Sequence, residues 1–175
     1  MALARRMELE SEKVGLLLKK AVYLYHKGDH ESAKQLFERA LAISEKVFGK
    51  EHPSVANSLN NLAELYRVQG NYEQAKPLYE RALAIYEKVH GKEHPSVATS
   101  LNNLAESYSN QGEYEKAKPL HERALAIREK VFNEDHPDDV LESLVNLAFL
   151  YDKQGDSEKA EPLFERSLKI LNKLF

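Results

Sequence analysis

Asparagine side chains recur at fixed intervals along this 175-residue sequence and could hydrogen-bond a ligand. Asn61, Asn103 and Asn146 follow one another at spacings of 42 and 43 residues, and Asn60 and Asn102 directly precede the first two. An amide offers two donors and an acceptor, so a row of amides can bond to a peptide backbone whatever side chains that peptide carries. The alternative interpretation is that these amides bond to neighbouring helices and hold the protein together. Both interpretations require repeated elements that place the amides in line.

Histidine also recurs, once in every 42 residues, as His52, His94 and His136, each directly before a proline. A metal ion needs three or four ligands that converge on it at about 2–2.2 Å. These three histidines instead stand at equivalent points of successive repeats, along a line. We therefore expect them to cap or pack at the joints between repeats, and we expect no metal site.

The sequence contains no motif typical of an enzyme or of a cofactor site. It lacks a glycine-rich phosphate loop, a His-Glu-x-x-His pair and a Gly-x-Ser-x-Gly turn, and it has no cysteine that could serve as nucleophile or thiolate ligand. Its carboxylates alternate with lysine and arginine on helix faces that we expect to be solvated, where nothing would shift their pKa values. We therefore expect a protein that is not an enzyme and binds no cofactor.

Composition excludes further classes. Hydrophobic residues make up 42% of the chain, too many for a disordered protein, and the formal net charge of −3 lacks the basic excess of a general nucleic-acid binder. The longest apolar runs, such as Ala21–Tyr25, are far too short to span a membrane, and the first ten residues do not resemble a signal peptide. We expect a cytoplasmic protein with neither membrane nor nucleic acid as a partner.

Internal repeats supply the elements that position these residues. Pro53–His94 and Pro95–His136 align without a gap and are identical at 30 of 42 positions. The string LNNLAE occurs at Leu59 and again at Leu101, and ERALAI occurs three times. We predict one domain, divided into an N-terminal extension (1–10), a divergent first repeat (11–52), two central repeats (53–94 and 95–136) and a fourth repeat (137–175) that ends without a capping helix.

Each repeat is predicted to be a pair of helices. Leu59, Leu62 and Tyr66 lie on one helical stripe, Gly70 can end that helix with a positive φ, and a second stripe with a period near 3.6 residues follows. One such pair cannot enclose its own apolar face. Stacking successive pairs buries both stripes continuously, which predicts a solenoid.

The order of small and large residues from Leu62 to Ala82 resembles the tetratricopeptide repeat. The 42-residue period, the NNLA and PLYERALAI strings and the GKEHPSVA joint resemble its kinesin light chain type. The resemblance implies an all-α fold, a right-handed superhelical solenoid of four helix-turn-helix repeats. It also implies that the first helices line a concave groove for an extended peptide, in which an asparagine at this position contacts the ligand backbone.

The resemblance predicts which residues face the groove and what ligand it takes. Acidic residues predicted to face the groove, Glu64 and Glu106 among them, outnumber the basic ones by two. We therefore expect the groove to favour a neutral or basic segment and to repel the acidic motifs of kinesin light chain cargo. The Lys and Arg positions of chaperone-binding carboxylate clamps hold Leu18, Thr99 and Asn103. The predicted peptide-binding residues are Asn60, Asn61, Asn102, Asn103, Asn146, Glu64, Arg67, Glu106, Phe149 and Lys153, with Phe149 as an apolar anchor.

Two functions are compatible with this sequence. The favoured one is a non-enzymatic adaptor that holds a peptide segment of a partner protein in the groove. The alternative is a structural segment of a longer array that self-associates. For that alternative we predict a homodimer contact through the last helix, where Leu171, Leu174 and Phe175 would have no further helix to cover them.

Overall fold

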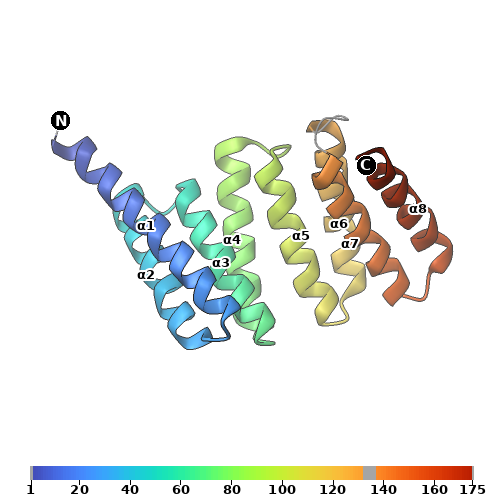
Figure 1. The fold of residues 1–175 in the computed structure, drawn as a ribbon, viewed down its shortest axis with the longest axis horizontal. Coiled ribbons are helices and arrows are strands. Elements are labelled where there is room, and N and C mark those ends of the chain that lie inside the picture. Colours follow the sequence, from blue (N-terminus) through green and yellow to red (C-terminus); the bar gives the residue numbers. More distant parts are fainter. Residues whose placement is uncertain (1, 132–136, 175) are drawn as a thin grey trace. The chain divides into compact units, whose positions relative to one another are not determined.

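The computed structural model describes residues 2–131 and 137–174, and side chains within residues 4–131 and 138–173. In this part of the chain every regular element is an α-helix, and successive helices form helix-turn-helix pairs (Figure 1). The eight described helices are α1 (Ala2–His26), α2 (His30–Phe48), α3 (Pro53–Val68), α4 (Tyr72–His90), α5 (Pro95–Asn110), α6 (Tyr114–Val131), α7 (Pro137–Lys153) and α8 (Ser157–Leu174). The predicted all-α fold of four repeated helix pairs is confirmed.

The chain forms two compact units, and each contains two helix pairs. Unit 1 covers residues 1–89 and unit 2 covers residues 90–175. In unit 1, α2 packs against α1 and α3; in unit 2, α6 packs against α5 and α7, and α7 packs against α8. The segment predicted as an N-terminal extension continues directly into the first repeat as part of α1, where Met7 and Leu9 are exposed.

Tight turns at glycine join the two helices of each pair. Gly70 follows α3 with φ 76° and Gly112 follows α5 with φ 77°, a backbone conformation that glycine adopts without steric cost. One residue later, the N–H of Asn71 donates to the carbonyl of Tyr66 at 2.8 Å. This bond satisfies a carbonyl of the last helical turn, so the chain can reverse within a few residues and α4 can return against α3.

The histidines before proline cap the first helices, as the sequence predicts. The Nδ1 atom of His52 accepts a hydrogen bond from the N–H of Ser54 at 3.1 Å, and that of His94 accepts one from Ser96 at 3.2 Å. Each ring also stacks on a residue of the preceding helix, His52 on Phe48 and His94 on His90. Burial, together with the neighbouring His90, lowers the pKa of His94, which favours the neutral ring that can accept at Nδ1. His136 lies outside the described residues.

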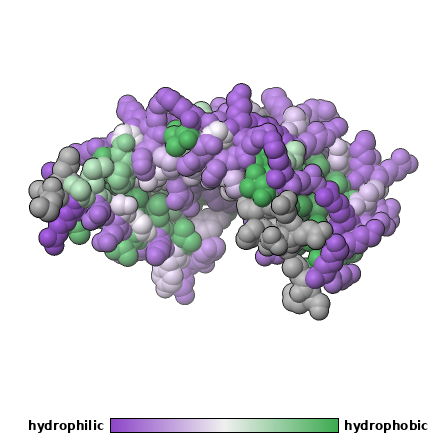
Figure 2. All heavy atoms as spheres, turned by 90° about the horizontal axis from the view of Figure 1, so that it is seen from above, coloured by the Kyte–Doolittle hydropathy of each residue, from purple (hydrophilic) through white to green (hydrophobic). Residues whose placement is uncertain are grey.

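The cores of both units combine large residues with alanines at the points of closest helix approach. In unit 1, Leu59 and Leu65 are fully buried among α2, α3 and α4, and Ala75 and Ala82 of α4 have no exposed surface. In unit 2, Leu144 and Leu150 of α7 pack with residues of α5, α6 and α8. This burial fixes which helix faces remain for a ligand. The face seen in Figure 2 is mostly hydrophilic, with separate hydrophobic patches.

Candidate functional site

The predicted site residues lie on one face of each first helix because they are spaced by three or four residues. On α5 this face carries Asn103, Glu106 and Asn110, and on α7 it carries Asn146, Phe149 and Lys153. Residues three, four and seven apart are neighbours on a helix surface. On α3 the corresponding residues include Asn61 and Glu64. Unit 1 and unit 2 each present such a face, and the two faces differ in their chemistry.

In unit 1, Glu64 is enclosed in a hydrogen-bonded network with Arg67 and Tyr79. The Arg67 guanidinium donates to both carboxylate oxygens of Glu64, at 2.8 and 2.6 Å, and the Tyr79 hydroxyl donates to Glu64 at 2.8 Å. Burial alone raises the pKa of Glu64, but the hydrogen bonds and charge of Arg67 and the Tyr79 hydroxyl outweigh it and hold that pKa below its ordinary value. Burial and the adjacent carboxylate raise the pKa of Tyr79. Both predicted groove residues, Glu64 and Arg67, therefore bind each other.

The other amides of α3 are partly occupied within the protein. Asn61 donates from Nδ2 to the backbone carbonyl of Asn57 at 2.8 Å and to its side-chain oxygen at 3.0 Å. This leaves the side-chain oxygen of Asn61 on a half-buried face. Asn60 is half-buried next to it, with its side-chain oxygen shielded from solvent.

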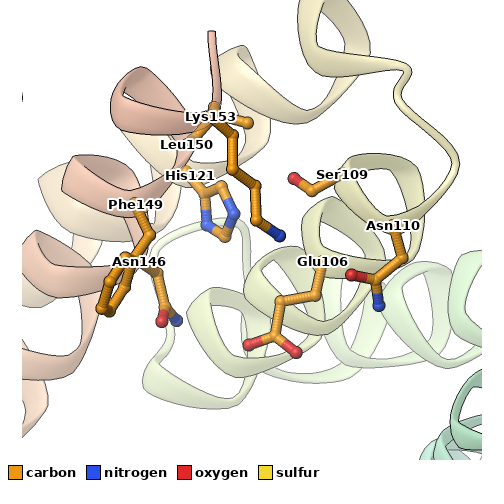
Figure 3. Close-up of a pocket in the computed structure, with 8 residues that line it drawn as sticks. All are labelled: Glu106, Ser109, Asn110, His121, Asn146, Phe149, Leu150 and Lys153. Atoms are coloured by element: carbon orange, nitrogen blue, oxygen red, sulfur yellow. The ribbon is translucent and has the colours of Figure 1, made fainter. Parts of the chain in front are cut away.

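In unit 2, the predicted face borders a pocket of about 200 Å³. Helix α5 contributes Glu106, Ser109 and Asn110, helix α6 contributes His121, and α7 supplies the opposite wall (Figure 3). The residues of that opposite wall are Asn146, Phe149, Leu150 and Lys153. Four predicted site residues, Glu106, Asn146, Phe149 and Lys153, are thus brought together.

Asn102 was predicted to bind peptide, but the structure places its side chain inside the helix packing of unit 2. Its side chain is 1% exposed. The amide nitrogen donates to Ser143 Oγ on α7 at 3.2 Å, and the amide oxygen lies 3.0 Å from Nδ1 of His121 on α6. Asn102 therefore connects three helices, as the alternative interpretation of the asparagines proposed. Asn103, one residue later, is half-buried on the predicted face.

His121 enters the pocket wall as a neutral ring. Because the Asn102 oxygen can only accept, Nδ1 of His121 must carry the proton, and Nε2 is left as an acceptor. Burial lowers the pKa of His121 to about 4, so the ring stays neutral near pH 7. No role for His121 was predicted from the sequence, although this residue replaces the tyrosine found 42 residues earlier at position 79.

Two polar atoms on the pocket wall have no hydrogen-bond partner among the described residues. They are Oγ of Ser109, whose residue is 8% exposed, and Nδ2 of Asn146. A polar group that is buried without a partner costs about 1–3 kcal/mol, so such groups in a pocket wall indicate a place where a ligand can complete the bonding. Phe149 is 52% exposed and is held edge-on by Phe164, with ring centroids 5.3 Å apart.

A buried arginine of α6, which bonds to residues of α5 and α7, was not anticipated from the sequence. Arg128 is 2% exposed, and its guanidinium donates to Ser143 Oγ and to the Asp139 carbonyl, each at 3.0 Å. It also pairs with Glu142 at 2.8 Å and donates to Thr99 at 3.3 Å. The charge of Glu142 on α7 is therefore paired with a cation from α6. The signal in the sequence was the replacement of Tyr86 by Arg128 between otherwise similar repeats.

A larger hollow of about 450 Å³ in unit 1 is a weaker candidate. It is lined by Glu45 of α2, the loop residues Lys50 and Glu51, and the α4 residues Arg81 and Lys88 among others. These charges pair with one another: Arg81 with Glu45 at 2.6 Å, and Lys88 with Glu51. The hollow is thus bordered by ion pairs that join successive helices, and we assign it to the packing of the joint.

Metal and membrane sites are not found in the described part of the chain. There, no three histidine, aspartate or glutamate side chains gather closely enough to hold a metal ion. None of the described helices is both long and apolar enough to cross a membrane.

The predicted homodimer contact lies on α8. There, Leu168 and Leu171 are exposed, by 59% and 38%, while the Leu174 side chain and Phe175 lie outside the described residues.

Two solved structures similar to this chain come from kinesin light chain-like proteins. BtubC (BKLC) from P. vanneervenii is 31% identical with a TM-score of 0.83, over 92% of this chain and 64% of that one. A candidate kinesin light chain from Podospora anserina with nearly identical TPR-like repeats is 31% identical with a TM-score of 0.80, over 93% of this chain and 77% of that one. The chain thus spans less than two thirds of BtubC.

More distant similarity is confined to the fold. Aspartyl phosphate phosphatase F from Bacillus subtilis has a TM-score of 0.79 at 18% identity, over 93% of this chain and 41% of that one. No curated protein matches the sequence. The family model of the tetratricopeptide repeat matches residues 14–88, 54–130 and 96–173, which together include nearly the whole sequence. The chain therefore belongs to the tetratricopeptide repeat family.

Proposed function

We propose that this protein is an adaptor that binds a peptide segment of a partner protein on the face formed by α5 and α7. Tetratricopeptide repeats generally mediate protein–protein interaction. The observation that carries the proposal for this chain is the pocket of about 200 Å³ in unit 2, with Ser109 Oγ and Asn146 Nδ2 on its wall. A bound segment can supply the hydrogen-bond partners that these two atoms lack within the described residues.

Asn103 and Asn146 are the proposed contacts to the backbone of the segment. They occupy equivalent positions on α5 and α7, which belong to the same unit. An amide that both donates and accepts can follow an extended peptide without selecting its side chains. In unit 1 we propose the same role for Asn61, whose amide nitrogen is already bonded within α3 and whose oxygen would be the atom that contacts ligand.

We propose that the protein acts by binding rather than by catalysis. Support comes from the titratable residues of these faces, which serve structural bonds. Glu64 is held by Arg67 and Tyr79, and His121 is fixed in one tautomer by Asn102. A general acid or base needs a pKa near the working pH, whereas that of His121 is lowered to about 4.

Replacing both Asn103 and Asn146 by alanine tests the proposal. An array of unrelated 15-residue peptides identifies binders of the intact protein, and the double variant should bind them about 10- to 30-fold more weakly, because roughly two hydrogen bonds are lost. The thermal midpoint should be nearly unchanged, since the Asn146 amide nitrogen has no partner among the described residues. Unchanged peptide affinity, or unfolding of the variant, would instead assign the amides to packing.

Self-association is a second candidate, favoured by one observation. Leu168 and Leu171 are exposed on α8, so this helix presents apolar surface to solvent. A contact between two copies would bury these leucines. Light scattering over a range of protein concentrations should then show a dimer that Leu171→Glu dissociates. A monomer at every concentration removes this candidate.

A further inference from the structure

A chain of buried hydrogen bonds in unit 2 determines which nitrogen of the His121 ring is an acceptor. Arg128, which can only donate, bonds to Ser143 Oγ at 3.0 Å. The Asn102 amide nitrogen donates to the same oxygen at 3.2 Å, so the amide oxygen faces Nδ1 of His121, 3.0 Å away. All four side chains are at most 2% exposed. The His121 ring, which lines the pocket, therefore carries its proton on Nδ1 and keeps Nε2 as an acceptor.

Three other side chains complete a mixed set of donors and acceptors around the pocket. Ser109 Oγ and Asn146 Nδ2 have no hydrogen-bond partner among the described residues. Ser109 is 8% exposed, and Figure 3 shows its hydroxyl and the Lys153 side chain pointing into the space beside the His121 ring. Glu106 also lines the pocket, but it already interacts within the protein and provides no open acceptor. The groups left for a ligand are donors on α7, an acceptor on α6 and, on α5, a hydroxyl that can be either.

This set of groups matches a primary carboxamide. The carboxamide oxygen can accept from Asn146 Nδ2 and from the Lys153 ammonium, and its NH2 group has one donor for His121 Nε2 and one for Ser109 Oγ. A carboxylate has no donor for His121. A guanidinium or an ammonium has no acceptor for Asn146 and is repelled by Lys153. A backbone peptide group has a single N–H, so it satisfies only one of the two acceptors.

The apolar part of the pocket wall suits the methylene groups that carry a carboxamide. Phe149 is 52% exposed beside the pocket, and its edge-on contact with Phe164 fixes the ring. Leu150 lines the same wall. A pocket of about 200 Å³ has room for several groups the size of a water molecule, whose share of liquid volume is about 30 Å³. The pocket therefore accommodates a short side chain that ends in an amide.

We infer that this pocket binds the primary carboxamide of an asparagine or glutamine side chain in the partner segment. The inference rests on the proposed function, because the peptide that α5 and α7 hold delivers this side chain. Asn146 Nδ2 carries two N–H donors, so it can bond to the carboxamide and to the peptide backbone together. The inference adds a sequence requirement to peptide binding: an amide residue must stand where the segment passes the pocket.

A titration with small amides tests this inference without knowledge of the partner. N-acetyl-glutamine methylamide is added at millimolar concentrations to the 15N-labelled protein. Two control probes have nearly the same shape: the glutamate analogue carries a carboxylate, and the 5-oxonorleucine analogue is a methyl ketone that keeps the acceptor but lacks the N–H donors. We expect the glutamine probe to shift the resonances of Ser109 and His121 and to bind about tenfold more tightly than either control. Equal or tighter binding of a control, or no shifts at these residues, overturns the inference.

The ring nitrogens of His121 provide a spectroscopic signature of the bound carboxamide. In a long-range 1H–15N spectrum of the imidazole, the Nε2 resonance should move when the glutamine probe donates to it, while Nδ1, bonded to Asn102, should change little. The ketone probe has no side-chain N–H to donate, so it should leave the Nε2 resonance in place. An Nε2 resonance that does not move when the protein is saturated with the glutamine probe contradicts the inference.

Two serines of α5 provide a matched pair of variants. Ser107 and Ser109 are both buried, and the Oγ of each has no hydrogen-bond partner among the described residues, but of the two it is Ser109 that lines the pocket. Ser109→Ala should weaken binding of the glutamine probe about 3- to 10-fold, whereas Ser107→Ala should leave it unchanged. Thermal melts of both variants check that the fold is kept. Equal losses of affinity in the two variants, or no loss in Ser109→Ala, contradict the inference.

The peptide array separates failure of this inference from failure of the proposed function. Binding peptides are resynthesised with each asparagine or glutamine changed to the corresponding acid or to alanine. If affinity falls about tenfold when one particular amide residue is changed, the inference holds. If peptides without asparagine or glutamine bind equally well but still depend on Asn103 and Asn146, the proposed function stands and the carboxamide pocket is wrong.

Discussion

The central repeats of this chain surround equivalent glutamates, Glu64 and Glu106, with different side chains. In α3 and α4, Glu64, Arg67 and Tyr79 satisfy one another, and this face contains its own cation. In α5 and α6, serine and histidine take the places of arginine and tyrosine, and a pocket borders the retained Glu106. The backbone is the same helix pair in both cases. The comparison teaches that substitutions at two positions change which polar groups a shared helix pair presents on its surface.

The largest effect is expected from removing the buried cation of unit 2. Arg128→Ala takes away a guanidinium that bonds to Ser143, Asp139 and Glu142, and it leaves a cavity under α7. We expect the free energy of unfolding to fall by about 3 kcal/mol, measured by urea denaturation. Arg166→Ala, which removes an exposed ion pair with Glu129, is the control and should cost less than about 0.5 kcal/mol. Similar losses in both variants would mean that Arg128 is not the anchor of unit 2.

The second effect depends on pH and arises from His121. Because burial lowers its folded-state pKa from 6.5 to about 4, the unfolded chain takes up a proton before the folded chain does. The stability linked to this ring is fully present above pH 6.5 and is lost as the pH falls to about 4, by at most about 3 kcal/mol. Urea midpoints of the wild type and of His121→Gln across this range isolate the contribution. Parallel pH profiles of the two proteins would contradict a buried neutral ring.

Adjacent asparagines should separate packing from binding. Asn102→Ala removes bonds to His121 and Ser143 inside unit 2, and should lower the free energy of unfolding by about 2 kcal/mol. Asn103→Ala, one residue away on the half-buried face, should change stability by less than about 0.5 kcal/mol and reduce peptide affinity instead. Thermal melts paired with peptide titrations give both quantities. A stability loss at Asn103 equal to that at Asn102 would erase the distinction.

The smallest effect is expected in the network of Glu64, Arg67 and Tyr79 in unit 1. Tyr79→Phe removes one hydroxyl that donates to Glu64, while Arg67 continues to hold the carboxylate. We expect a loss of about 1 kcal/mol near neutral pH, measured by urea denaturation, with Tyr23→Phe on exposed surface as the control. The loss should diminish in acid, because the lowered pKa of Glu64 means that the network stabilises the fold only while the carboxylate is ionised. A loss that does not change with pH would place the hydroxyl outside the network.

Much of the fold could be predicted from the sequence because repeated local chemistry determines it. The helix-ending role of Gly70 and the capping roles of His52 and His94 depend on residues within a few positions, and the structure confirms them. The apolar stripes predicted which faces pack, and Leu59 and Leu62 are buried as their spacing indicates.

The candidate site was predictable only in part because its bonds cross between helices. Periodicity placed Asn102 and Asn103 on neighbouring faces, but it could not reveal that His121 and Ser143 would occupy both polar groups of Asn102. Nor could it show that Arg128, a residue type usually found on the surface, is enclosed by polar groups of α7. Their partners lie 11 to 41 residues away in the sequence, so only the packed helices bring them together.

The peptide affinity of the variant carrying Asn103→Ala and Asn146→Ala, measured beside its thermal midpoint, tests most directly whether the face of unit 2 serves binding. Our account predicts that peptides bind about 10- to 30-fold more weakly while the midpoint is nearly unchanged. Unchanged affinity together with a lower midpoint would contradict the account, because the amides would then serve packing.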